Sequence, residues 1–151
     1  MSDELLRPTI AAGVEPSARR PWRLLYMGYV AVLGGMLPIT WLSFVNSGRL
    51  GLGRTRRLLI VGIGVAGLVA ECVLAGWLQI GENDDAMLAR LTPVRVVAAL
   101  CYLVQLRLQL PLERAFQLRG GEHATRFGAG NIVMIGLTAI VEAIIVLVAA
   151  S

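Results

Sequence analysis

Long apolar runs, separated by short polar segments, dominate this chain. The last run, Phe127 to Ser151, has 25 residues and a single ionisable side chain, Glu142. A bilayer is crossed by roughly 20 residues of apolar helix. The runs therefore predict an all-α integral membrane protein, a four-transmembrane-helix bundle over residues 22–151 that follows a polar N-terminal tail over residues 1–21. The four predicted helices lie close to residues 22–46, 57–80, 93–117 and 127–150.

The third predicted span is the least regular of the four. Its apolar part begins at Val96 and is too short to cross alone. We still expect a crossing, because the hairpin before it and the strong span after it must be connected. Its polar side chains, Gln105, Arg107 and Gln109, are then expected to face the bundle interior. Four crossings would place both ends of the chain on the same side of the membrane.

The first predicted span carries an internal break signal. Gly34 and Gly35 are followed by Pro38, which removes a backbone hydrogen bond, so a kink is expected near Gly34. One interpretation is a bent helix packed closely on a neighbour. The other is a discontinuous helix of the kind that transporters use at substrate sites.

Composition supports a lipid environment. The chain is 56% hydrophobic and 16% charged, whereas soluble domains carry about a quarter charged residues. All its basic residues are arginines, and the net charge of +4 suits contact with anionic lipid head groups. These arginines are scattered over helix flanks without an aromatic platform, so we predict no nucleic-acid binding.

The distribution of arginines predicts orientation only weakly. Seven arginines flank the first and third loops and six flank the opposite side, so we predict that loops one and three are cytoplasmic, in a bacterial plasma membrane. The seven are Arg49, Arg54, Arg56, Arg57, Arg114, Arg119 and Arg126, and the six are Arg7, Arg19, Arg20, Arg23, Arg90 and Arg95.

The sequence shows no combination of residues that is typical of an enzyme active site. His123 is the only histidine, and Cys72 and Cys101 both lie inside apolar runs. The acidic loop GENDD, residues 81–85, lacks the spacing of a calcium loop and predicts a solvated turn. We therefore predict no enzyme activity, no cofactor and no metal site.

Two carboxylates inside apolar runs are the strongest candidates for function. Glu71 shares a helical face with Gly64, Gly67 and Ala75, which predicts a packed seam between helices. Glu142 lies well inside the last run. An ionised carboxylate at mid-membrane costs at least about 2.5 kcal/mol, so both must be protonated, paired or hydrated.

The candidate polar core extends beyond the two carboxylates. Arg107 is the predicted cationic partner, and Asn131 and Thr138 share a helical face with Glu142. Such a core is either a proton or ion relay with a small polar pocket, or a hydrogen-bonded seam that fixes helix register. The full candidate set is Glu71, Glu142, Arg107, Asn131 and Thr138, with Gln105 and Gln109 beside it.

The two halves of the chain share a layout. Leu37-Pro38 recurs as Leu110-Pro111, Thr55-Arg56 recurs as Thr125-Arg126, and Glu71 recurs as Glu142. This layout predicts two tandem helical hairpins, with both glutamates on helices that run in the same direction at nearly the same depth.

One family resemblance follows from that layout. The stretch IVMIGLTAIVEAIIVLV is similar to an ion-carrying helix of the duplicated proteolipid subunits of rotary ATPase rings. The likeness covers only the second and fourth spans, and the alternating glycine run of the family's first helix is missing here. It implies an architecture of paired hairpins with one glutamate in each second helix.

Two function classes remain open from the sequence. The first is a non-enzymatic accessory protein or complex subunit held together by helix packing. The alternative is a small oligomeric transporter or channel that uses Glu71 and Glu142 for proton or cation coupling. Expected partners are the lipid bilayer and either further copies of this chain or other membrane subunits.

Overall fold

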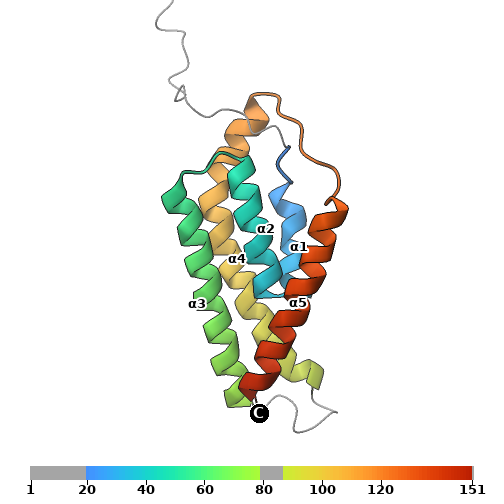
Figure 1. The fold of residues 1–151 in the computed structure, drawn as a ribbon. Coiled ribbons are helices and arrows are strands. Elements are labelled where there is room, and N and C mark those ends of the chain that lie inside the picture. The colour runs from blue at the N-terminus through green and yellow to red at the C-terminus, as the bar shows by residue number, and fades with distance from the viewer. Residues whose placement is uncertain (1–19, 79–86, 151) are drawn as a thin grey trace, which may run out of the picture.

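The computed structural model describes residues 20–78 and 87–150, which form five helices. The predicted tail, up to residue 19, and the acidic turn at residues 81–85 lie outside the described residues. The helices pack side by side in one elongated bundle (Figure 1). They are α1 Leu24–Gly34, α2 Met36–Arg49, α3 Arg54–Leu78, α4 Met87–Leu118 and α5 Ala129–Ala150.

The first predicted span is not one crossing helix but a hairpin of two short ones. α1 and α2 meet at Gly35 and run antiparallel, so the start of α1 and the end of α2 lie at the same end of the bundle (Figure 1). The backbone N–H of Trp22 donates to Asn46 Oδ1 at 2.7 Å, and Arg49 donates to the carbonyl of Arg20 at 3.0 Å. The kink expected near Gly34 is thus confirmed as a break between two helices. At this break the chain reverses its direction.

Local sequence explains why the chain turns at Gly35. This residue has φ +99°, a left-handed conformation that residues with a Cβ rarely adopt. Its N–H donates to the carbonyl of Val30 and closes α1. Pro38 then falls in the first turn of α2, where a backbone N–H has no partner inside the helix, so proline is tolerated there.

Three helices are long and apolar enough to cross a membrane: α3, most of α4 (Thr92–Leu118) and α5. The predicted count of four is not confirmed. At about 1.5 Å per residue, α1 and α2 reach only about 16 and 21 Å, against a hydrocarbon core of about 30 Å. In the described chain, the start of α1 and the end of α5 lie at opposite ends of the bundle (Figure 1), so the expectation that both ends share a side is not confirmed.

The helix predicted over residues 93–117 is longer than expected. α4 begins at Met87, so Pro93 lies inside it rather than at its start, and it continues past Pro111 to Leu118 as predicted. Gln105 and Gln109 are buried on its inner face, but Arg107 is exposed. The three polar residues therefore divide between the interior and the surface.

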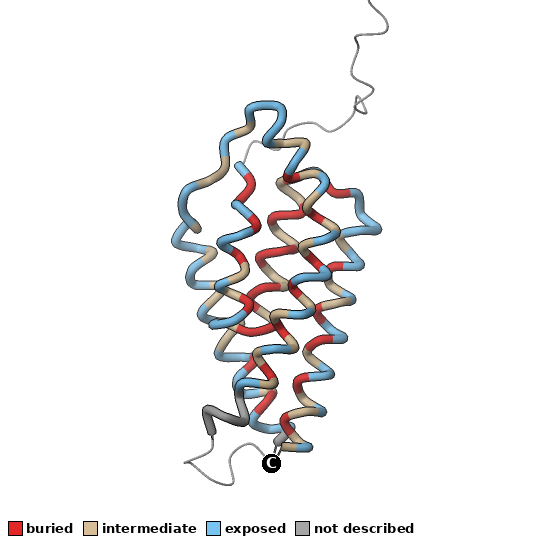
Figure 2. Tube along the Cα trace, turned by 180° about the vertical axis from the view of Figure 1, so that it is seen from behind, coloured by how far each residue is buried: buried red, intermediate tan, exposed pale blue. Residues whose placement is uncertain are grey.

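Packing follows the predicted small-residue seam on α3. Its buried residues are Ile60, Gly64, Gly67, Glu71 and Ala75. A Cβ on Gly64 would overlap Thr40, and one on Gly67 would overlap Met36, so α2 lies directly against this face. Figure 2 shows buried residues on the inner sides of the helices and exposed ones on the outer sides, where apolar side chains predominate.

The topology generates a labelling prediction. In a chain whose own cysteines are replaced by alanine, Arg20→Cys and Thr55→Cys should react from one side of the membrane and Ala149→Cys from the other. All three positions are exposed at the two ends of the bundle. A membrane-impermeant maleimide applied to intact cells and to inverted vesicles makes the measurement. Labelling of Arg20→Cys and Ala149→Cys from the same side would contradict a three-crossing chain.

Candidate intramembrane polar site

The carboxylate of Glu142 joins three elements at the tip of the α1–α2 hairpin. Its Oε2 accepts the backbone N–H of Leu37 at 2.6 Å, and its Oε1 lies 3.0 Å from Arg95 Nη1. Glu142 is only 2% exposed, whereas about a third of the Arg95 side chain remains accessible. The site therefore combines a buried anion on α5, a cation on α4 and the start of α2.

Glu142 acts as a cap on α2. The first N–H groups of a helix have no intrahelical acceptor, and they form the positive end of its dipole. Gly35, the residue that precedes α2, has no side chain to supply an acceptor. A carboxylate from α5 supplies it instead, across 105 residues of sequence.

Gly35 is required by this contact as well as by its backbone angle. A Cβ at this position would overlap both the carboxylate of Glu142 and the guanidinium of Arg95. The turn, the cap and the ion pair thus occupy one tightly filled volume near the middle of the bundle.

Glu71 lies beside this group without a hydrogen bond of its own. It is fully buried, and neither carboxyl oxygen has a hydrogen-bond partner among the described residues. Glu142 and Arg95 both act on it electrostatically. Two ionised carboxylates can only accept hydrogen bonds, so Glu71 and Glu142 bond to each other only if one of them holds a proton.

A row of polar side chains leads from the tip towards the end of the bundle at which α1 begins and α2 ends. Gln105 on α4 donates to Thr40 Oγ1 on α2 at 3.2 Å and to the carbonyl of Ile60 at 3.4 Å. Further along, Asn46 donates to Gln109 Oε1 at 3.3 Å. Ser43 Oγ, Gln105 Oε1 and Gln109 Nε2 are buried and keep hydrogen-bonding capacity that these contacts do not use.

The row ends at a second carboxylate cap. Glu113 on α4 accepts the backbone N–H of Leu24, the first residue of α1, at 2.9 Å. His123 Nε2 lies 3.5 Å from the same carboxylate oxygen, and the Tyr102 hydroxyl donates to the Leu24 carbonyl. Each arm of the hairpin therefore begins against a glutamate from a long helix.

An apolar layer closes the bundle on the other side of the tip. Ala75, Val94 and Val146 are buried together there, with Leu74 and Leu78 packed against them. The two sides of the Glu71–Glu142 pair thus differ: polar side chains lead to one end of the bundle, and apolar ones separate the pair from the other.

The structure brings together two of the five predicted site residues, Glu71 and Glu142, on parallel helices as expected. Arg107 is exposed, and the ion pair of Glu142 is with Arg95 instead. Asn131 lies in the first turn of α5, eleven residues before Glu142. Thr138 Oγ1 donates to the carbonyls of Met134 and Ile135 in its own helix.

Sequence reasoning missed Arg95 and Glu113. A signal for both was present, since both fall on one stripe of α4 at steps of three or four residues. The stripe contains Arg95, Ala98, Tyr102, Gln105, Gln109 and Glu113.

Within residues 20–78 and 87–150, no three histidine, cysteine or acidic side chains come together as a metal site. No protein-family model, curated protein or solved structure matches this chain. The hairpin also departs from the four-span outline on which the resemblance to ring proteolipids rests.

The tip geometry predicts an unusually costly substitution. Gly35→Ala should lower the free energy of unfolding by about 2 kcal/mol or more, because it strains the backbone and displaces the Glu142 cap. Gly62→Ala is the matched control, since nothing lies within 4 Å of its added Cβ, and helix propensity favours alanine there. Thermal unfolding in detergent compares them, and equal stability of the two variants would refute the tightly filled tip.

The ion pair and cap generate a second stability prediction. Glu142→Ala should cost about 2–3 kcal/mol, because it leaves Arg95 unpaired and the start of α2 uncapped. Glu122→Ala, which removes an exposed ion pair with Arg20, should stay within about 0.5 kcal/mol. A double-mutant cycle of Glu142→Gln with Arg95→Gln should give a coupling free energy of about 1 kcal/mol or more. Additive effects in that cycle would argue against the pair.

Proposed function

We propose that α3, α4 and α5 cross the membrane and that α1–α2 is a re-entrant hairpin that enters from one face and returns to it. Non-helical backbone is tolerated at membrane depth only where protein buries it or where it lines a polar cavity. Gly35 fits this condition, because it is buried against Glu142 and Arg95. Three of the five helices then contribute full crossings, and four crossings are not needed.

This placement also sharpens the orientation. With α1 entering and α2 leaving at one end, Arg20 and Arg23 join the arginines of loops one and three. Among the described residues that end carries Arg20, Arg23, Arg49, Arg54, Arg56, Arg57, Arg114, Arg119 and Arg126. The positive-inside rule then favours a cytoplasmic position for the arginine-rich end, in the direction that the sequence predicted weakly.

For the activity, we propose a non-enzymatic transporter or channel in which Glu71 and Glu142 exchange a proton. The observation that carries this proposal is Glu71, a fully buried carboxyl that lies beside the Glu142–Arg95 pair and receives a hydrogen bond from no other described group. As a structural residue it would cost stability without a compensating bond. A proton shared with Glu142 supplies that bond, and its gain and loss is a chemical event that glutamine or an apolar residue cannot perform.

Arg95 favours a proton over a metal cation. Its guanidinium lies against Glu142 Oε1 and within electrostatic reach of Glu71. A cation placed between the two carboxylates would face this fixed positive charge at short range, where Coulomb repulsion in a poorly polarisable interior is strong. A proton bound to one carboxylate oxygen avoids that cost.

The polar row supports access from the arginine-rich end. Between the tip and the Glu113–His123 pair lie two hydrogen-bonded pairs, Gln105 with Thr40 and Asn46 with Gln109. Both glutamines keep spare hydrogen-bonding capacity. Such groups can hydrogen-bond to intervening water, and the proton would then move along that water. The apolar layer of Ala75, Val94 and Val146 would hold the opposite route closed in this conformation.

The enclosure of the site favours a second candidate. Glu71 and Glu142 are 0% and 2% exposed, so neither reaches solvent in this arrangement. A scaffold needs no such access. The same contacts would then make the protein an accessory subunit of a membrane complex, as a homo-oligomer or with other subunits, whose polar seam fixes the hairpin in place.

Proton flux separates the two candidates. The wild-type chain is reconstituted into proteoliposomes that contain a pH-sensitive dye. Under an imposed potassium diffusion potential, the pH of their lumen should change, in the direction set by the sign of the potential. Glu71→Gln and Glu142→Gln should each abolish that flux, because an amide does not exchange a proton. Glu122→Gln, outside the site, should keep it.

Stability provides the control for this experiment. Glu71→Gln should retain the wild-type thermal midpoint in detergent, because its amide can donate to Glu142 in place of the shared proton. Normal flux in the double glutamine variant would sink the proton proposal. Sodium-driven flux that is independent of pH would instead assign a metal cation. Absence of any flux from a correctly assembled wild type would favour the subunit, whose mass in detergent would then report its partners.

A further inference from the structure

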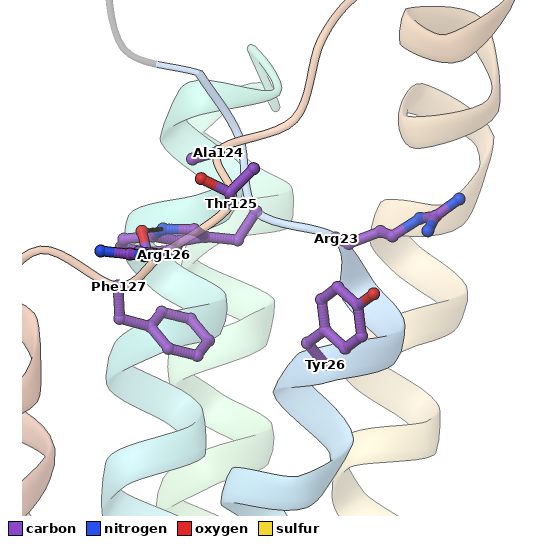
Figure 3. A pocket seen from close by; sticks show the side chains of 7 residues that line it. Arg23, Tyr26, Ala124, Thr125, Arg126 and Phe127 are labelled. Atoms are coloured by element: carbon purple, nitrogen blue, oxygen red, sulfur yellow. Dashed lines mark hydrogen bonds between the residues drawn. The ribbon is translucent and has the colours of Figure 1, made fainter.

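A second site lies at the arginine-rich end of the bundle, away from Glu71 and Glu142. A pocket of about 220 Å³ opens between the start of α1 and the segment that leads into α5 (Figure 3). Its lining consists of Trp22, Arg23, Tyr26, Ala124, Thr125, Arg126 and Phe127. Neither the proton proposal nor the hairpin cap uses this pocket.

The interior of the pocket is aromatic and firmly held. Trp22 Nε1 donates to the carbonyl of Arg126 at 3.2 Å, and the rings of Trp22 and Phe127 pack with centroids 5.2 Å apart. The guanidinium of Arg49 stacks 3.7 Å from the ring of Trp22. The backbone N–H of Ala124 donates to the carbonyl of Pro21 and ties the two walls together.

The rim of the pocket is cationic. Figure 3 shows Tyr26 and Phe127 on opposite sides of the opening, with Arg23 and Arg126 extending outward on either side. Both arginines are exposed, and neither forms an ion pair with another residue that the structure describes. The first turn of α5, which begins two residues after Phe127, contains no acidic residue to offset its positive end.

We infer that this pocket binds one anionic glycerophospholipid. Aromatic side chains with arginines beside them are typical of the head-group level of a bilayer. The phosphate would lie at the rim beside the two exposed guanidinium groups, which suit its oxygens well. The glycerol and upper acyl chain would occupy the aromatic interior. This inference rests on the membrane placement of the bundle and is independent of proton exchange at Glu71 and Glu142.

Native mass spectrometry of the full chain in detergent tests the site directly. With added phosphatidylglycerol, the wild type should retain one lipid more tightly than it retains phosphatidylcholine. Arg23→Gln with Arg126→Gln should weaken phosphatidylglycerol binding about tenfold or more, since each basic residue near an anionic head group contributes substantially. Arg54→Gln with Arg56→Gln, two exposed arginines of the same end outside the pocket, is the matched control and should change it less than twofold.

Fluorescence provides an independent readout if the double variant fails to fold. In a Trp41→Phe and Trp77→Phe background, brominated phosphatidylglycerol should quench Trp22 more strongly than brominated phosphatidylcholine. Equal effects of the two double variants would overturn the site in favour of diffuse attraction. Equal retention of both lipids, or displacement by inorganic phosphate at comparable concentration, would also overturn it.

Discussion

The fold depends on one carboxylate that is placed against the start of a short helix. Glu142 accepts the N–H of Leu37 and pairs with Arg95, and Gly35 turns the chain at this point because no side chain fits there. Without an acceptor, the free N–H groups at the start of α2 would be buried in an apolar medium, at a cost of several kcal/mol each. The hairpin can end inside the bundle because α5 supplies that acceptor.

The same constraint recurs at the other end of the hairpin and organises the remaining polar residues. Glu113 accepts a backbone N–H at the start of α1, as Glu142 accepts one at the start of α2. Between these caps, the polar face of α2 meets the stripe of glutamines on α4. Buried polar groups in a membrane bundle need such partners, so the helices are held in one register by hydrogen bonds as well as by the small-residue packing of α3.

Glu71 does not follow this pattern of buried polar groups with hydrogen-bond partners. Both of its carboxyl oxygens are buried without a donor among the described residues, whereas Gln105 and Gln109 each make at least one hydrogen bond. Buried polar groups without partners are rare in native structures and often coincide with function. Its position next to the cap of the α1–α2 hairpin links any change in its charge to the contact that holds the hairpin tip.

The sequence alone determined the features that depend on spacing along one helix. The apolar runs predicted α3 and α5, the steps of three and four residues predicted the buried face of Gly64, Gly67 and Glu71, and the Gly-Gly and Pro38 signal predicted the break. These are local properties, because helical periodicity and glycine conformation act within a few residues.

Only the tertiary structure decided the direction of the chain after the break and the partner of Glu142. Hydropathy measures how long an apolar run is, and a run from residue 22 to 46 is equally suited to one crossing or to two half-length arms. The reversal depends on an acceptor 105 residues away in the chain. For the same reason, the sequence alone predicted Arg107 as the cationic partner. The rotation of α4 against its neighbours instead places Arg95 at the site and leaves Arg107 on the exposed surface.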